Sequence, residues 1–242
     1  MRAYDRPDLI KTETKSINDY VTNVDREAEH IIVSTLQKTF PDHAFITEES
    51  GNLGSPDAEY QWIIDPLDGT LNFTRGIPHF SVAIACQHKG RLVSSIVYDP
   101  VRQEEFTASK GEGGYVNRTR LRVSSQTKIS ESVMSWGGRM TDEMIPKHTR
   151  LMQTLLEEKA ILRETGSACL DLAYLAAGRL DVVWMHRLKH WDMAAGLLLL
   201  TEAGGLAGDF SGGNDHIQSG NLLAATPGCF RILAPLLKKN LT

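Results

Sequence analysis

The segment from Trp62 to Phe73 holds the side chains of this 242-residue chain that are best suited to chemistry. Its apolar start predicts a strand that delivers Asp65 to its carboxyl end. Pro66 has no N–H and turns the chain, which leaves the Leu67 carbonyl without a ladder partner, and Asp68 follows. Two carboxylates and a carbonyl are hard oxygen ligands of the kind that Mg²⁺ takes. The spacing therefore predicts a magnesium site.

Gly69 and Thr70 come directly after this ligand set. If a helix begins there, the backbone N–H groups at its positive end can hold a phosphate. The alternative is that Asp68-Gly69 is merely a turn, because Asp-Gly pairs are usual in turns.

Two further acidic sites lie elsewhere in the chain. Glu48-Glu49-Ser50 ends a short apolar segment, and adjacent carboxylates there must be solvated or bound to metal. Asp192 precedes an apolar helical stretch, where an aspartate taken alone is more often a helix cap. A solvated loop is the corresponding alternative for Glu48.

The composition is that of an ordinary globular protein. Lys and Arg number 26 against 30 Asp and Glu, the net charge is −4, and 41% of residues are hydrophobic. No basic stretch indicates a direct nucleic-acid site. Three cysteines without a C-x-x-C pair suit a reducing cytoplasm, and neither a signal peptide nor an apolar run long enough to span a membrane is present. We expect a cytoplasmic protein with no membrane part.

Hydrophobic periodicity predicts mostly β-structure in the first half, after one helix. We expect the helix at 24–40, capped by Thr22 or Asn23, and strands at 43–47, 60–65, 80–87, 92–98, 105–108 and 121–123. The segment 50–59 is expected to be a polar connection.

The second half alternates between the two types of element. We expect helices at 141–158, 166–177, 191–203 and from Pro227 onward, the last interrupted at Pro235, and strands at 160–163, 181–185 and 221–225. This order predicts a layered α/β (α+β) fold with mixed sheets in a single domain, 1–242, with sub-regions 1–130 and 131–242.

Three motifs, in order, resemble the signature of the inositol monophosphatase family and especially its bacterial branch. They are Glu48-Glu49-Ser50, Asp65 to Thr70 and Trp191 to Gly196, supported by Asn18 to Asp25, Gly166 to Ala168 and Thr201 to Gly205. The resemblance implies the inositol monophosphatase/fructose-1,6-bisphosphatase-like fold, a sandwich of alternating helix and sheet layers. It also implies a homodimer.

The resemblance further implies hydrolysis of a phosphate monoester with two or three Mg²⁺ ions and no phosphoenzyme. Glu48, Asp65 and the Leu67 carbonyl would hold one ion, and Asp65, Asp68 and Asp192 a second. The residues implied to act on water are Glu48 and Thr70, supported by Asp25; those implied to bind substrate are Asp68, Gly69, Thr70, Ala168, Asp192 and the Met185 position.

The substrate implied is inositol monophosphate or a similar sugar phosphate. Met185 stands where inositol-using members carry a glutamate, and it cannot accept a hydroxyl hydrogen bond well. The basic segment 186–190 suits a second anionic group, although a solvated or dimer-facing loop explains it equally well. Fructose 1,6-bisphosphate, NADP and adenosine bisphosphate are therefore alternatives. Only 17 residues precede Asn18, fewer than family members usually have.

Two other functions compete with this one. Aspartyl-phosphate hydrolases place two aspartates two residues apart, whereas Asp65 and Asp68 are three apart. A role as a binding factor in ribosomal RNA transcription or maturation is the other, as in some bacterial relatives. No Glu lies between His186 and His190 as a zinc protease requires, so this pair does not indicate a zinc site. We expect both to be surface histidines. The cysteines are expected in the core.

Overall fold

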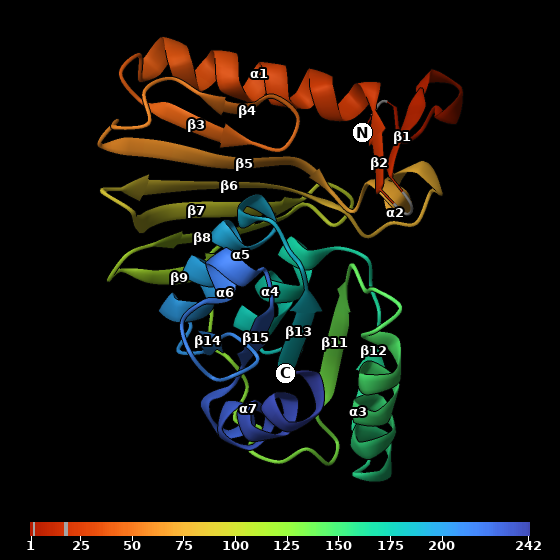
Figure 1. Ribbon diagram of the computed structural model, residues 1–242. Coiled ribbons are helices and arrows are strands. Elements are labelled where there is room, and N and C mark those ends of the chain that lie inside the picture. Colours follow the sequence, from red (N-terminus) through yellow and green to blue (C-terminus); the bar gives the residue numbers. More distant parts are fainter. Residues whose placement is uncertain (2, 17–18) are drawn as a thin grey trace.

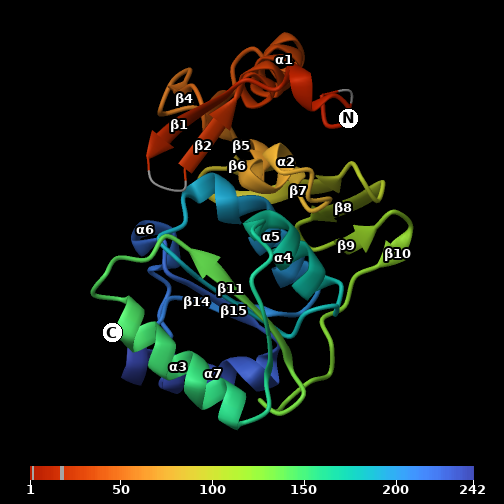
Figure 2. The ribbon, with the colours of Figure 1, turned by 90° about the vertical axis from the view of Figure 1, so that its right-hand side faces the viewer.

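Two β-sheets and three layers of helices alternate in the structure, a computed structural model that describes residues 1, 3–16 and 19–242 (Figure 1). From top to bottom in Figure 1 the layers are helix α1, a large sheet, helices α4 and α5, a second sheet, and helices α3 and α7. The expected layered α/β fold is confirmed. Figure 2 shows the same layers from the side.

The first sheet has eight strands in the order β10-β9-β8-β7-β6-β5-β3-β4. Strands β3 and β5 are parallel, and the other neighbours are antiparallel. A separate two-stranded hairpin, β1–β2, precedes this sheet. The strands are β1 (Thr12–Ser16), β2 (Asp19–Thr22), β3 (Ala44–Thr47), β4 (Gly51–Leu53), β5 (Tyr60–Asp68), β6 (Ser81–His88), β7 (Arg91–Asp99), β8 (Glu104–Ser109), β9 (Gly113–Val116) and β10 (Thr119–Arg120).

The second sheet has five strands in the order β12-β11-β13-β15-β14. Strand β11 is parallel to both of its neighbours, and β15 is antiparallel to both of its own. The strands are β11 (Val133–Gly138), β12 (Ile161–Arg163), β13 (Val182–His186), β14 (Leu206–Gly208) and β15 (Leu222–Ala225).

Helix α1 begins where its capping signal predicts. Thr22 caps α1, and its backbone N–H in turn donates to Asp25 in a capping box. The helices are α1 (Asn23–Thr39), α2 (Thr70–Thr74), α3 (Ile145–Glu157), α4 (Ala168–Ala176), α5 (His190–Glu202), α6 (His216–Ser219) and α7 (Pro227–Leu241), with a short 3-10 helix at Pro7–Leu9.

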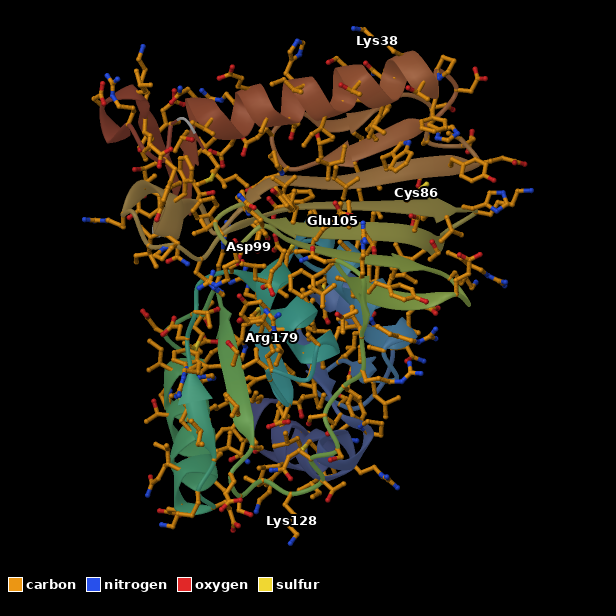
Figure 3. All side chains as sticks on the ribbon, turned by 180° about the vertical axis from the view of Figure 1, so that it is seen from behind. Lys38, Cys86, Asp99, Glu105, Lys128 and Arg179 are labelled. Carbon is orange, nitrogen blue, oxygen red and sulfur yellow. The ribbon has the colours of Figure 1, made fainter. Side chains whose placement is uncertain are left out.

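Helix α5 lies between the two sheets and is apolar on all sides, as a helix with no water-facing side must be. Every residue from Met193 to Leu200 is buried. Ala195 and Leu198 pack toward the first sheet, whereas Leu197 and Leu200 pack toward the second. Figure 3 shows side chains filling the space between the sheets. This packing fixes the start of α5 relative to both sheets.

The outer face of the second sheet is covered by α3 and α7. Alternation along β13 explains how one strand serves both layers: Trp184 packs toward α3 and α7, while Val183 and Met185 pack toward α4 and α5. Helix α1 covers the first sheet through Val33, which packs in one cluster with Phe45 and Ile64.

Four expectations about the elements are wrong. Residues 121–123 form no strand, because Leu121 and Val123 make single backbone bonds to Gly114 and to the end of α5 instead of a ladder. Strand β5 does not end at residue 65 but continues to 68. Third, segment 50–59 is not only a polar connection, because it contains the short strand β4. Strand β11 is a separate omission, since no element was expected at 133–138.

The fourth concerns α7, which is not interrupted at Pro235 but runs through it. Leu233 and Leu237 are fully buried on either side of the proline, and their packing offsets the backbone hydrogen bond that the proline removes.

No helix in the described part of the chain is long and apolar enough to cross a bilayer. Cys86, Cys169 and Cys229 are free thiols and buried, which confirms the expectation that they are core residues. Asn18, the first residue of one supporting motif, lies outside the described residues.

Candidate active site

A bulge near the end of β5 turns two aspartates to the same face of the first sheet. The strand register pairs Asp65 with Ala83 and Asp68 with Ser81, so that three steps along β5 match two steps along β6. Side chains three residues apart on a regular strand point to opposite faces, and one extra residue brings them to one face. Pro66, which cannot donate to a ladder, lies in the bulge. The two carboxylates converge for this reason.

The parallel pairing of β3 with β5 brings Glu48 beside Asp65. Thr47 pairs with Ile64. Glu48 and Asp65 directly follow these two residues, so they lie at the same edge of the sheet. Glu48 is half-buried and Asp65 is only 2% exposed. The motif at 48–50 and the motif at 65–70 therefore meet.

Asp68 is held by donors from both parts of the chain. Its Oδ2 accepts hydrogen bonds from the Ser81 and Ser167 hydroxyls and, at 3.0 Å, from the Cys169 N–H. Its Oδ1 accepts from the Ala168 N–H at 3.0 Å. Since Oδ1 accepts a single hydrogen bond in this set, it keeps a lone pair for a cation.

Asp192 lies in the first turn of α5 and reaches back to accept the Lys189 N–H at 2.7 Å. This hydrogen bond gives Asp192 the helix-capping role that the sequence favours when the residue is considered alone. The same carboxylate also faces the cluster: burial, together with the charge of Asp68, raises the pKa of Asp192 to about 7, against the opposing effect of Lys189 and Arg139. Capping and membership of the cluster are thus compatible.

Thr70 connects this cluster to helix α1. Its hydroxyl lies 3.0 Å from Asp25 Oδ1 and 3.0 Å from the Leu67 carbonyl oxygen, so its one proton can go to either acceptor. The Thr22 N–H donates to Asp25 Oδ2 at 3.0 Å, which fixes the aspartate. Asp25 is fully buried, and burial raises its pKa.

Gly69 begins the short helix α2 with a backbone conformation that favours glycine. Its φ is +89°, and a Cβ there would lie 3.1 Å from the His79 carbonyl oxygen and 3.3 Å from that of Gly166. The helix that the sequence allowed for after Asp68 is present, because α2 begins at Thr70, but it is only five residues long.

A cavity of about 570 Å³ opens beside Asp68 and Asp192. Ala168 and Met185 line it, although Met185 is only 3% exposed and packs in the apolar cluster under α4 and α5. The remaining charged side chains on its wall have both signs; they are Arg139, Asp142, Glu164 and Arg187.

The carboxylate cluster fits a divalent cation. Burial, then the charges of Glu48, Asp68 and Asp192, raises the pKa of Asp65 well above its ordinary value. Ionised carboxylates that raise one another's pKa in this way repel one another, and a cation between them removes the repulsion. The donors are oxygens, which suit Mg²⁺. The electrostatics of this chain therefore match an oxygen-ligated metal site.

Sequence reasoning missed three positioning residues. Glu29 on α1 is 2% exposed and accepts the N–H groups of Glu49 and Ser50, both at 2.8 Å, which fixes the turn after β3. Asn72 donates to the carbonyls of His79 and Thr165, both at 2.8 Å, and so ties α2 to the segment before α4. Ser81 is the third. The four-residue spacing of Asp25 and Glu29, which puts both on one helix face, could have pointed to Glu29.

His186 is not a surface residue, contrary to expectation. It is fully buried, and its Nε2 lies 3.2 Å from Nδ1 of His148 on α3. Burial, with the neighbouring His148, lowers the pKa of His186 to about 4. His190 is half-buried at the start of α5. The expected basic segment therefore reduces to Arg187 and Lys189, which are exposed.

Comparisons with known proteins agree with this geometry. A Nus factor SuhB from Pasteurella multocida is 46% identical over 239 residues, covering 98% of this chain and 88% of that protein. The crystal structure of the extragenic suppressor protein suhB from Bartonella henselae matches with a TM-score of 0.94 and 38% identity, over 98% of this chain and 92% of that one.

A Thermotoga maritima IMPase matches with a TM-score of 0.89 and 32% identity, over 99% of this chain and 91% of that one. The model of the inositol monophosphatase family matches residues 1–241. By sequence, by fold and by the order of its motifs, the chain belongs to the inositol monophosphatase family.

Proposed function

We propose that this protein is a magnesium-dependent phosphate monoester hydrolase. The observation that carries the proposal is the convergence of Glu48, Asp65, Asp68 and Asp192 on one cluster, where burial and then mutual repulsion raise the pKa of Asp65. Two of them, Asp68 and Asp192, line the cavity. Family membership supports the same reaction class. We place the activity in the cytoplasm.

In this proposal the carboxylates form two overlapping ligand sets. Glu48, Asp65 and the Leu67 carbonyl oxygen would hold one Mg²⁺, and Asp65, Asp68 and Asp192 would hold a second. Bound Mg²⁺ lowers the pKa of the attacking water and neutralises charge on the phosphate oxygens. The bulge in β5 supports the sharing of Asp65, because it turns both aspartates to one face.

Thr70, Asp25 and Glu48 orient the water. When the Thr70 hydroxyl donates to Asp25 Oδ1, its oxygen lone pairs are left to accept a hydrogen bond from the water. Glu48, at the end of β3, is the base that draws the proton away. Asp25 acts through Thr70, and Thr22 fixes Asp25 in turn.

The backbone N–H groups of Gly69 and Thr70 bind the phosphate, and Ala168 and Asp192 contact the rest of the substrate in the cavity. Met185 presents an apolar surface where a hydroxyl-binding glutamate would lie. We therefore propose inositol monophosphate or a similar sugar phosphate as substrate, and bisphosphates or NADP as alternatives that Arg139 and Arg187 could favour.

The experiment is phosphate release by the purified protein from a panel of these compounds, with Mg²⁺ and with EDTA. Glu48→Gln is the test variant, and Asp57→Asn, in an exposed turn, is the matched control. We expect activity that needs Mg²⁺ and Glu48 but not Asp57. Turnover that survives EDTA or Glu48→Gln would refute the proposed site.

A second candidate function is a binding role in ribosomal RNA transcription or maturation. It is favoured by the relatives named Nus factor SuhB, which are 42–47% identical over nearly the full chain. Gel filtration with purified RNA polymerase tests it, with Glu48→Gln in parallel. A complex that forms equally with both proteins would support a role independent of the carboxylate cluster.

We also propose a homodimer, in line with the family resemblance. Light scattering across a concentration series checks it, and a monomer mass at every concentration would exclude it.

A further inference from the structure

Cys169 brings a sulfur atom to the carboxylate cluster. One ligand atom each of Asp65, Asp68 and Cys169 lie within 4.8 Å of one another. In the described residues this is the one group of three or more metal-ligating side chains that close together. All three residues are buried, with Cys169 at 0% exposure and Asp65 at 2%.

The position of the sulfur is fixed by helix α4. Cys169 is the second residue of that helix, and its N–H is bound to Asp68 Oδ2. Its Sγ lies 3.3 Å from the backbone carbonyl oxygen of Asp192. When the thiol donates its proton to that carbonyl, the sulfur lone pairs are available on the side of the carboxylates. Cys169 therefore contacts two residues of the proposed ligand set and lies close to the third.

Sulfur and oxygen donors select different ions. Mg²⁺ takes oxygen ligands and gains nothing from a thiol, whereas Zn²⁺ and Cd²⁺ bind thiolate strongly and carboxylate as well. Zinc holds sulfur at about 2.3 Å and oxygen at about 2.1 Å, so donors that already lie within 4.8 Å of one another need side-chain movements on the order of an ångström.

We propose that Asp65, Asp68 and Cys169 form a binding site for a thiophilic divalent cation, Zn²⁺ or Cd²⁺, that overlaps the oxygen-ligated magnesium site. On binding, the thiol releases its proton to solvent and the sulfur forms a bond to the ion, with no change in oxidation state. The inference concerns the same cluster as the proposed function, but it does not require that the protein hydrolyse a phosphate ester.

The other two cysteines provide internal controls. Cys86 lies on β6 (Figure 3), and Cys229 lies on α7, where its sulfur faces the backbone carbonyls of Gln126 and Lys128 at 3.6 and 3.7 Å. Neither belongs to a group of three ligating side chains in the part of the chain that the structure describes.

The test is a titration of the reduced, metal-free, full-length protein with Cd²⁺, followed by the ultraviolet charge-transfer band of the cadmium–thiolate bond. We expect the band to saturate at one equivalent in the wild type and in Cys229→Ala, and to be absent in Cys169→Ala. Calorimetry should show Zn²⁺ affinity reduced on the order of a hundredfold in Cys169→Ala, with Mg²⁺ affinity unchanged.

Cys169→Ser, which keeps the size of the side chain, replaces the alanine variant if circular dichroism shows that the latter does not fold. A band that is absent in the wild type, or that persists without Cys169, overturns the proposal. The band without hydrolysis on any substrate would refute the proposed function alone, and hydrolysis without the band would refute this inference alone.

Discussion

The Ser167 hydroxyl donates a hydrogen bond to Asp68, 99 residues earlier in the chain. Asp68 ends β5 in the first sheet, whereas Ser167 directly precedes α4, which packs against both sheets. With the Ala168 and Cys169 N–H groups, this bond places a carboxylate at the positive end of α4. The same side chain thus serves the proposed metal site and the junction between the two sheets.

Asp68→Asn should therefore lower stability as well as activity. The sequence alone suggests an intact fold, because only a metal charge is removed, but the structure gives this carboxylate four donors. An amide NH₂ facing those donors leaves buried groups unpaired, at a cost of about 1–3 kcal/mol. Urea unfolding measures it, with Asp57→Asn as the control. Equal unfolding midpoints for Asp68→Asn and wild type would contradict the prediction.

Glu29→Gln should weaken magnesium binding without touching a proposed ligand. Glu29 accepts the N–H groups of Glu49 and Ser50 with its two oxygens, and a glutamine offers only one acceptor. The turn that follows Glu48 then loses a charge-assisted hydrogen bond worth roughly 1.5–3 kcal/mol. Calorimetric titration with Mg²⁺ should show reduced affinity. Glu27→Gln, on the exposed side of the same helix, is the matched control, and equal affinities for the two variants would exclude this role.

Thr70→Val should lower kcat by about a hundredfold or more, since the hydroxyl that we propose orients the water is lost while the size of the side chain is kept. Thr70→Ser keeps the hydroxyl and should retain most of kcat. Steady-state kinetics on the preferred substrate compares the two variants. If serine and valine impair the enzyme equally, the hydroxyl has no part in the reaction.

Asp171 should make stability depend on pH. It is fully buried in α4, where it accepts hydrogen bonds from Ser135 and Thr165, and burial raises its pKa to about 7. Between its ordinary pKa near 4 and pH 7, the folded protein holds a proton here that the unfolded chain has lost, so stability falls as pH rises through this range. Above pH 7 the contribution is constant. His79, 3.9 Å away, is mostly neutral near pH 7 because burial lowers its pKa.

Asp171→Asn replaces the titrating carboxyl with an amide that does not ionise. The hydroxyls of Ser135 and Thr165 can rotate to form hydrogen bonds with this amide. The free energy of unfolding of wild type minus that of the variant should therefore fall between pH 5 and pH 8. Urea unfolding at both pH values checks it. A difference that does not change with pH would mean that Asp171 is ionised throughout the range.

The sequence predicts the layered fold and the order of most elements because their hydrophobic periodicities and caps are local signals. Thr22 illustrates this, since its capping box with Asp25 is readable from four residues and is present in the structure. Strand β11 escaped prediction because residues 133–138 include two glycines and few β-branched residues, and partners from distant segments decide its conformation.

In the candidate site, too, the features that depend on distant segments of the chain could not be predicted from the sequence. The acidic residues are recognisable from their motifs, but the bulge that turns Asp65 and Asp68 to one face depends on the register with β6. His186 was misjudged because a polar, basic neighbourhood in sequence says nothing about the partner that the fold supplies, here His148. Glu29 was missed because its two donors lie on the other side of a turn, 20 and 21 residues away.

The carboxylate cluster takes its residues from distant parts of the chain, and this has a consequence for folding. Glu48, Asp65 and Asp68 come from the first 70 residues, whereas Asp192 and the α4 donors arrive only when α4 and α5 pack between the sheets. The early part of the chain thus carries three mutually repelling carboxylates until the later part docks. A divalent cation held by ligands from both parts stabilises the native state by mass action. If the proposed site holds such an ion, the ion is a noncovalent cross-link, and we expect the melting temperature of the protein to rise with divalent-ion concentration.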